Sequence, residues 1–380
     1  MTAPLTSVER TVTSDKLDIV ILGLSITSSW GNGHATTFRA LAKALHAEGH
    51  RVTFLERDVA WYAGNRDLPA PPYCRAILYG SLAELAEAYG PLVRNADLVV
   101  IGSFVPEGIA VARWARAEAR GCLAYYDIDT PATLAALERG SCNYLDRGLV
   151  PAFDVYLSFT GGPTLLRLER ELGARAARPL YCSVDPDHHG PAVDGALDHQ
   201  RWDLGYMGTY SADRQPALDM LLLEAARHLP DSRFVVAGAL YPDGLDWPAN
   251  VERIVHVAPG VHRQFYGAQR LTLNVTRADM VRAGHSPSVR IFEAAACGTP
   301  IISDVWPGLE SFLRPGEEIL LARGAEDVLR CLTLLDPDEL RRIGQRGRRR
   351  VLAEHTAAHR ARELLAYTCE TSRLRARGRA

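Results

Sequence analysis

The sequence predicts two α/β domains in tandem, each a doubly wound parallel sheet with helices on both faces. Short apolar runs alternate with stretches of helical spacing from residue 17 onward, and the alternation begins again after a turn-rich segment at 184–191. The length of 380 residues suits two domains. We therefore expect Rossmann-like domains at 1–183 and 184–356 that face a common cleft, with the last helix, at about 357–380, packing back on the first domain.

In the first half, the continuous apolar run at 17–25 is typical of a strand buried on both faces. Helical spacing follows at 35–49, where Gly49 is a candidate helix end, and a second strand is expected at 51–56. The same criteria predict a helix at 107–119 and further strands at 98–101, 122–126, 155–158 and 179–182.

In the second half, a helix is expected at 216–229, and strands at 204–208, 233–237, 253–257, 271–275 and 300–303. The chain from Asp336 onward reads as helical and basic, and it includes the arginine-rich segment 341–350. That segment is either a nucleic-acid patch or the solvated face of an amphipathic helix. We favour the helix, with the core-facing residues Leu340, Ile343, Val351 and Leu352.

The composition excludes several classes of protein. Hydrophobic residues make up 47% and charged residues 23%, which is enough apolar material for two hydrophobic cores. The net charge of −2 gives no overall electrostatic attraction to nucleic acid. Apolar runs are of strand length, so no membrane span is expected, and the polar segment 1–15 lacks a signal core. Seven cysteines without a CxxC pair indicate buried reduced thiols. A cytoplasmic protein is expected.

Polar residues after the first strand form the first candidate site. The loop at 25–37 carries Gly31, Gly33 and His34, and it matches neither a Walker A loop nor a GxGxxG fingerprint. His34 is either a substrate contact or base, or a residue that stabilises the loop or caps the helix.

The second candidate site follows the strand at 122–126, where Asp127 and Asp129 stand one residue apart. Strand alternation would put both carboxylates on one side, which permits joint metal ligation. Catalysis or acceptor contact is the alternative that we favour, and a third is that Asp129 caps the helix opened by Thr130 and Pro131.

The third candidate site is the segment 282–304, in which a Gly/Ser/Pro loop leads into a short helix. The helix N-terminus near Ser288 suits a phosphate, Arg290 can pair with it, and Glu293 can accept both hydroxyls of a ribose. A core helix explains the neighbouring alanines, but it leaves the charge of Glu293 unexplained.

These residues carry a resemblance. The segment 282–304 resembles the nucleotide-sugar motif of retaining, two-domain GT-B glycosyltransferases of the group 1 kind. Together with 25–45, 53–58 and 126–131 it looks like the spore-maturation CgeB-like branch, and the likeness covers nearly the whole chain. One position departs from the pattern. Group 1 enzymes carry two glutamates eight positions apart, and here the first position is His285.

The resemblance implies transfer of a sugar from a nucleoside diphosphate sugar, held by the second domain, to a small-molecule or surface glycan acceptor, held by the first. Asp129, Asp127 and His34 would serve catalysis at the acceptor. The expected donor contacts are Gly208, Thr209, Arg214, Arg277, His285, Ser288, Arg290 and Glu293. No cofactor, metal or nucleic acid is expected, and the oligomeric state stays open. Two alternatives remain, a sugar-nucleotide epimerase or hydrolase on the same fold and a catalytically silent sugar-nucleotide-binding protein.

Overall fold

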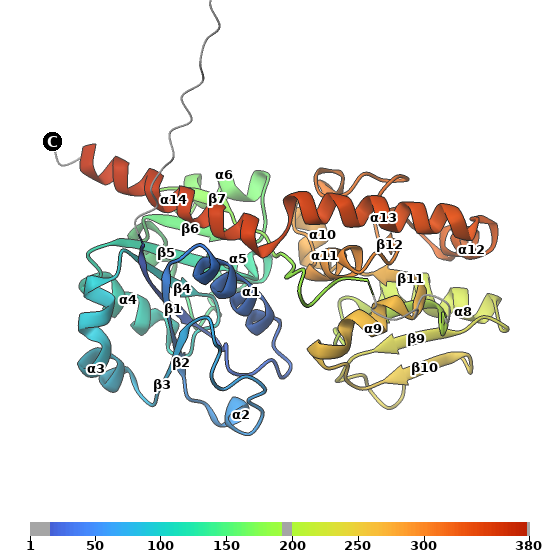
Figure 1. The fold of residues 1–380 in the computed structure, drawn as a ribbon, viewed down its shortest axis with the longest axis horizontal. Coiled ribbons are helices and arrows are strands. Elements are labelled where there is room, and N and C mark those ends of the chain that lie inside the picture. The colour runs from blue at the N-terminus through green and yellow to red at the C-terminus, as the bar shows by residue number, and fades with distance from the viewer. Residues whose placement is uncertain (1–15, 192–199, 378–380) are drawn as a thin grey trace, which may run out of the picture.

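The computed structural model describes residues 16–191 and 200–377 (Figure 1). The polar segment 1–15 and the last three positions of the expected C-terminal helix lie outside the described residues. Two α/β bodies lie side by side, and two long C-terminal helices run along the same edge of both. No helix of the described ranges is long and apolar enough to cross a membrane.

The first domain is built on a seven-stranded, all-parallel sheet in the order β3-β2-β1-β4-β5-β6-β7. The interior strand β1 explains the apolar run in the sequence. Ile19 and Ile21 pack into the core on one face, and Val20 and Leu22 pack into the core on the other. The strands are β1 (Asp18–Gly23), β2 (Arg51–Arg57), β3 (Arg75–Tyr79), β4 (Leu98–Gly102), β5 (Cys122–Asp127), β6 (Val155–Ser158) and β7 (Ala177–Pro179).

Helices cover both faces of this sheet, as parallel crossovers require. They are α1 (Gly33–Ala47), α2 (Ala60–Ala63), α3 (Leu82–Asn95), α4 (Gly108–Glu118), α5 (Thr130–Glu138) and α6 (Pro163–Arg170), with a 3₁₀ turn at Arg147–Ala152. Gly49 ends the first crossover as the sequence predicts: its N–H bonds to the carbonyl of His46, and its φ of +91° suits glycine.

The second domain repeats the architecture with a six-stranded parallel sheet in the order β10-β9-β8-β11-β12-β13. Its strands are β8 (Trp202–Met207), β9 (Phe234–Ala237), β10 (Val251–Ile254), β11 (Gln269–Asn274), β12 (Ile301–Ser303) and β13 (Leu320–Leu321). Its helices are α7 (Gln215–Leu218), a π-helical turn (Asp219–Leu223), α8 (Glu224–His228), α9 (His262–Gly267), α10 (Ala278–Ala283), α11 (Val289–Ala296) and α12 (Ala325–Leu334). The prediction of two parallel-sheet α/β domains is therefore confirmed.

The chain crosses between the domains twice, and the two crossings lie side by side. Val184 N–H bonds to the carbonyl of His355, and Ala357 N–H bonds to the carbonyl of Val184. Helix α13 (Pro337–Glu354) lies on the second domain and ends just before the second crossing. Helix α14 (Ala357–Arg377) follows the crossing and packs against α1 of the first domain. Ala361 and Leu364 of α14 are fully buried in the core of the first domain.

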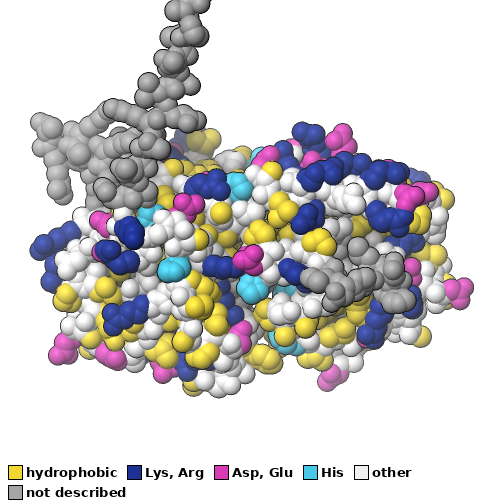
Figure 2. Space-filling model, in the orientation of Figure 1, with side chains coloured by type: hydrophobic (Ala, Val, Ile, Leu, Met, Phe, Trp, Pro, Cys, Tyr) yellow, Lys and Arg dark blue, Asp and Glu magenta, His cyan; other side chains and the backbone are white. Residues whose placement is uncertain are grey.

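The basic segment 341–350 lies on α13, and the amphipathic interpretation holds. Leu340, Ile343 and Val351 are buried, whereas Leu352 is half-buried. Several of the arginines are engaged by acidic partners on the same helix, among them Asp338 and Glu339. Figure 2 shows these basic side chains as a band over α13, away from the junction of the domains.

Two predicted strands are displaced. The strand expected at 179–182 is β7, which ends at Pro179, and the buried residues after it lead into the linker. The strand expected at 253–257 is β10, which ends at Ile254, because the chain turns outward at Val255. The edge strand β3 was not predicted, although it contains the short apolar run 76–79, and most of its residues are only partly buried or exposed. Four of the seven cysteines, Cys122, Cys182, Cys297 and Cys331, are buried.

Candidate functional site

The site lies where the carboxyl ends of the two sheets meet. The loop after β6 contacts the loop before α11: Thr160 Oγ1 lies 2.8 Å from Ser286 Oγ, and Gly161 N–H donates to the carbonyl of His285 at 2.9 Å. The N-terminal turn of α5 lies against α10. Loops at strand ends therefore supply the groups from both domains, as is usual for ligand sites of open parallel sheets.

His34 and Asp129 form a dyad on the first domain. The Nε2 atom of His34 lies 2.9 Å from Asp129 Oδ2, although the residues are 95 positions apart. The side chain of Asp129 is 38% exposed and that of His34 is 10% exposed, so the carboxylate is the more accessible member. Burial raises the pKa of Asp129, but the hydrogen bond and charge of His34 and the charge of Arg277 outweigh it, and the pKa lies below the usual value.

The structure bears on one alternative for each dyad residue, the role of a helix cap. Asp129 stands at the N-cap position of α5, yet its side chain makes no capping hydrogen bond. Helix α1 is capped by Asn32, whose side chain accepts the N–H of His34 at 2.9 Å. Neither the Asp129 nor the His34 side chain therefore caps a helix, and the two side chains contact each other. Arg277, which directly precedes α10 of the second domain, lies close enough for its charge to act on Asp129.

Asp127 plays a different part. It is fully buried, and its carboxylate accepts hydrogen bonds from Tyr156 Oη at 2.5 Å and from Thr133 Oγ1 at 2.7 Å. Burial raises the pKa of Asp127 to about 6, in spite of these donors. The strand ends at Asp127, so strand alternation does not continue to Asp129, and the expectation that both carboxylates share one side is wrong. The surroundings of Asp127 favour a positioning role over contact with a substrate.

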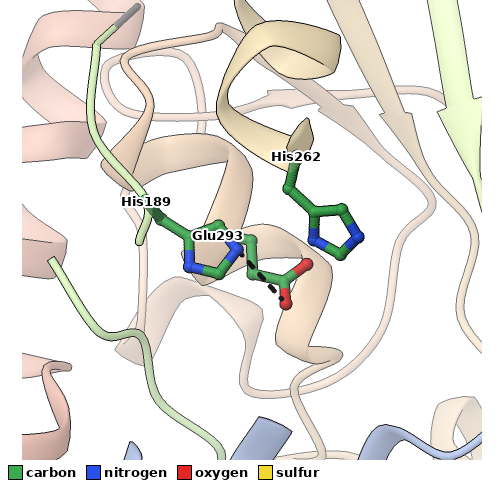
Figure 3. Close-up of side chains that lie close together, drawn as sticks. All are labelled: His189, His262 and Glu293. Atoms are coloured by element: carbon green, nitrogen blue, oxygen red, sulfur yellow. Dashed lines mark ion pairs between the residues drawn. The ribbon is translucent and has the colours of Figure 1, made fainter. Parts of the chain in front are cut away.

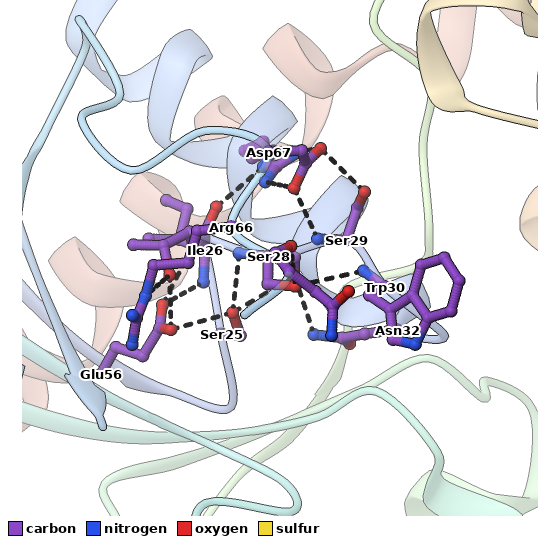
Figure 4. A network of polar contacts seen from close by, with 12 residues as sticks. Ser25, Ile26, Ser28, Ser29, Trp30, Asn32, Glu56, Arg66 and Asp67 are labelled. Atoms are coloured by element: carbon purple, nitrogen blue, oxygen red, sulfur yellow. Dashed lines mark hydrogen bonds and ion pairs between the residues drawn. The ribbon is translucent and has the colours of Figure 1, made fainter. Parts of the chain in front are cut away.

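The loop before α1 is organised by Glu56, a residue of β2 for which the sequence predicted no role at the site. Its fully buried carboxylate accepts N–H bonds from Ile26 and Thr27, and hydroxyl bonds from Ser25 and Thr27, at 2.7–3.0 Å (Figure 4). Four donors offset the cost of burying the charge. This anchor fixes the loop from which Asn32 and His34 project.

A second carboxylate, Asp67, holds the outer part of the same loop. It forms a bidentate pair with Arg39 at 2.8 Å, and it accepts the N–H and hydroxyl of Ser29 (Figure 4). Next to it, Trp30 packs on His256 of the second domain with ring centroids 5.4 Å apart. The two domains thereby border a cavity of about 310 Å³, lined by Ser29, Trp30, Asn65, Asp67, His256, Ala258, Pro259 and Gly260. None of these contacts has a local signal in the sequence.

On the second domain, Arg290 reaches across the carboxyl ends of the central strands. Its guanidinium donates to the carbonyl of Met207, to Asn274 Oδ1 at 3.0 Å and to Ser288 Oγ at 3.2 Å, and it stacks over the ring of Tyr206. The partners are neutral, so they orient the guanidinium without cancelling its charge. Ser288 is also the N-cap of α11, with its side chain accepting the N–H of Arg290.

Three arginines that the sequence assigned to the donor lie near one another. Burial lowers the pKa of Arg214, and the positive charges of Arg290 and Arg277 lower it further. Arg214 donates to the carbonyl of Thr209 at 2.5 Å. Gly208 has no room for a side chain, because a Cβ would lie 2.8 Å from Arg290 Nη2. The arrangement concentrates positive charge beside exposed backbone and suits an anion.

Glu293, on the second turn of α11, is buried. Its Oε2 accepts the hydroxyl of Tyr266 at 3.2 Å, and its Oε1 lies 3.7 Å from Nε2 of His189. Burial lowers the pKa of His189, the other buried partner. The expected ribose contact of Glu293 stays a prediction.

His285 packs between the domains, and no side-chain hydrogen bond to it was found in the described residues. A Cβ on Gly162 would lie 2.4 Å from its imidazole, so this glycine allows the ring to approach. Its backbone is strained, with a φ of +45°, and is held by a 2.6 Å bond from its N–H to the carbonyl of Pro307. Its expected donor contact remains untested.

Comparisons with known proteins agree with this architecture. A family model described as "Glycosyl transferase-like" matches residues 214–366. No curated protein sequence matches the chain significantly. The chain has the GT-B fold of glycosyltransferases.

The similar solved structures cover nearly all of both chains. Sucrose-phosphate synthase from Thermosynechococcus elongatus is 17% identical over 95% of this chain and 98% of its own, with a TM-score of 0.64. HepE from Anabaena, solved with UDP and glucose, is 14% identical over 93% of this chain and 100% of its own, with a TM-score of 0.65. An alpha-glucosyltransferase, solved with UDP and a 13-mer DNA, is 12% identical over 93% of this chain and 100% of its own, with a TM-score of 0.69.

The raised pKa of Asp127 in this GT-B chain gives a prediction about stability. Between the ordinary value of 3.8 and about 6, the folded chain holds a proton at Asp127 that the unfolded chain has lost. This group therefore makes the free energy of unfolding fall as pH rises through that window, by about 3 kcal/mol in all. Asp127→Asn removes the titration, so the melting temperature of the variant minus that of the wild type should rise between pH 4.5 and 7.

Asp129→Asn is the matched control, because the pKa of Asp129 is lowered. Its ionised form stabilises the fold above the ordinary pKa, and this contribution is lost as pH falls. A difference in melting temperature for Asp127→Asn that stays flat from pH 4.5 to 7 would contradict a buried, raised carboxyl at this position.

Proposed function

We propose that this chain transfers a glycosyl unit from a nucleoside diphosphate sugar to a small-molecule or glycan acceptor. The observation that carries the proposal is the charge arrangement at the junction of the domains. The His34–Asp129 dyad of the first domain faces Arg277, and Arg277 acts together with Arg214 and Arg290 on the second. The acceptor then binds to the domain of residues 1–183, and the nucleotide binds to the domain of residues 184–356.

The second domain is suited to the leaving group. When the glycosidic bond to the donor breaks, negative charge builds up on the nucleoside diphosphate, and stabilising it needs cations and amide dipoles more than a base. Arg214, Arg277 and Arg290 supply the charge, with the hydroxyl of Ser288 and the backbone of Gly208 and Thr209 beside them. Arg290 is already oriented by neutral acceptors, so little reorganisation is needed when the diphosphate arrives.

The first domain is suited to the acceptor. Asp129 is ionised at neutral pH, because its pKa lies below the ordinary value, and it is the more exposed member of the dyad. It orients the acceptor nucleophile or accepts its proton. His34 bonds to Asp129 from a buried position and therefore acts as a positioning residue. Asp127 and Glu56 hold the two loops that carry the dyad.

The similar structures point to a first donor to test. HepE and the alpha-glucosyltransferase have both been solved with UDP or UDP-glucose. For this chain we therefore take UDP-glucose as the leading candidate donor, with Glu293 at the ribose and His285 near the sugar. The match over residues 214–366 agrees with glycosyl transfer.

Three finer assignments belong to the same proposal. Membership in the CgeB-like branch rests on the motifs at 25–45, 53–58, 126–131 and 286–293. A cytoplasmic location fits the expectation of reduced thiols in a chain whose seven cysteines include no CxxC pair. A small-molecule or glycan acceptor rather than a nucleic acid fits the net charge of −2.

Nucleotide binding is the first prediction. A panel of UDP, GDP and ADP in a thermal-shift assay should identify one ligand that stabilises the chain, by about 2.7 kcal/mol at 100 times its dissociation constant. Glu293→Gln should weaken that ligand about tenfold by calorimetry, because a neutral amide accepts hydroxyl bonds less strongly than a carboxylate. The exposed Glu224→Gln is the control. Equal affinities in Glu293→Gln and the wild type would remove Glu293 from the ribose site.

Turnover is the second prediction. Asp129→Asn should lower nucleoside diphosphate release from the donor by about 10²–10⁴-fold, while nucleotide binding hardly changes. Asparagine would serve equally well as a helix cap, so an unchanged rate with an unchanged melting temperature would return Asp129 to a structural role. Release measured with and without a panel of sugar and glycan acceptors separates transfer from hydrolysis and epimerisation. No turnover of any bound donor would identify a binding protein.

Metal independence at the diphosphate is the third prediction. Three arginines occupy the place where a divalent ion would neutralise the leaving group, so the rate should agree within about twofold with and without added Mg²⁺ or Mn²⁺. Dialysed enzyme without chelator is the reference sample. A rate that depends on either ion by tenfold or more would show that the arginines are insufficient.

A further inference from the structure

Three side chains with metal-binding atoms lie close together at the second domain (Figure 3). His189 comes from the interdomain linker, His262 is the first residue of α9, and Glu293 comes from α11. One ligand atom from each lies within 4.8 Å of the other two. Among the described residues, 16–191 and 200–377, no other group of three or more His, Cys, Asp or Glu side chains brings its ligand atoms this close together.

Three of the four ring nitrogens of this cluster lack a hydrogen-bond partner inside the protein, and the fourth, His262 Nε2, lies 3.3 Å from the carbonyl of Val257. The side chains of His189 and Glu293 are 5% and 7% exposed. Both ring nitrogens of His189 and the Nδ1 of His262 are buried without a hydrogen-bond partner. The 3.7 Å between His189 Nε2 and Glu293 Oε1 is too long for a hydrogen bond. Buried polar atoms are nearly always satisfied, so three such nitrogens around one carboxylate indicate a missing partner.

The chemistry of the donor set selects the partner. Two imidazoles and one carboxylate form the set that holds zinc in three-ligand sites, with a fourth position left for water. Mg²⁺ and Ca²⁺ prefer oxygen atoms alone, so the two imidazoles disfavour them.

We propose that His189, His262 and Glu293 bind one Zn²⁺ or a similar divalent transition-metal ion. The bound ion joins the interdomain linker to α9 and α11 and so fixes how the chain enters the second domain. This site differs from the diphosphate site, where the arginines carry the charge. Because a carboxylate has room for about four partners, Glu293 can ligate through Oε1 and still meet a ribose.

The test is a titration of the untagged full-length chain, stripped with a chelator and dialysed, with ZnCl₂ in the absence of any nucleotide. Calorimetry should show one Zn²⁺ per chain, and the melting temperature should rise as the site fills. MgCl₂ at the same concentrations should give neither effect. Because His262 is only half-buried, His262→Ala should fold, and it should lose affinity for Zn²⁺ about 100-fold.

His188→Ala is the matched control, since His188 is the sequence neighbour of His189 but its side chain is 67% exposed. It should bind Zn²⁺ as the wild type does. Absence of binding by the wild type, or equal binding by His262→Ala and the wild type, would overturn the site. His189→Ala should behave like His262→Ala. If it fails to fold, His262→Ala decides the outcome. Nucleotide binding is measured separately, so either proposal can fail without the other.

Discussion

Every strand pair in both sheets is parallel, and this constraint determines where the chemistry of the molecule lies. Parallel strands end at one edge, so the loops that follow them are collected at that edge. The two edges meet at the contact of Thr160 with Ser286, and the dyad and the arginines lie on either side of the junction. Helix α14 closes the arrangement by returning to the first core, where Leu364 is fully buried.

Buried carboxylates define the first domain's share of the site. Glu56 and Asp127 are both fully buried, and each accepts hydrogen bonds from several donors. Such groups are costly unless they are satisfied, and when satisfied they allow a single loop conformation. Here they fix the loop before α1 and the turn before α5. Asp129, between these two loops, keeps an accessible carboxylate because its neighbours carry the structural bonds.

Local patterns in the sequence predicted most of the fold and part of the site. Apolar runs marked the buried strands, and the helix with Arg290 and Glu293 was placed correctly because its signal lies within one short segment. Contacts over long separations were invisible: Glu56 meets its partners from about thirty residues away, and His34 meets Asp129 from 95. The shared orientation of the two aspartates was wrong because strand alternation stops where the strand ends. His189 had no signal, because its partners come from two other elements.

The charges at the junction link the two halves of the proposed reaction. Arg277 helps to keep the pKa of Asp129 low, and it also belongs to the arginine group that would bind the diphosphate. In the proposed reaction, a bound diphosphate would offset the charge of Arg277 and so weaken its effect on the carboxylate. The pKa of Asp129 would then rise, and Asp129 would become a better proton acceptor when the donor is in place. The same arginine would therefore stabilise the leaving group and make the basicity of Asp129 depend on the presence of the donor.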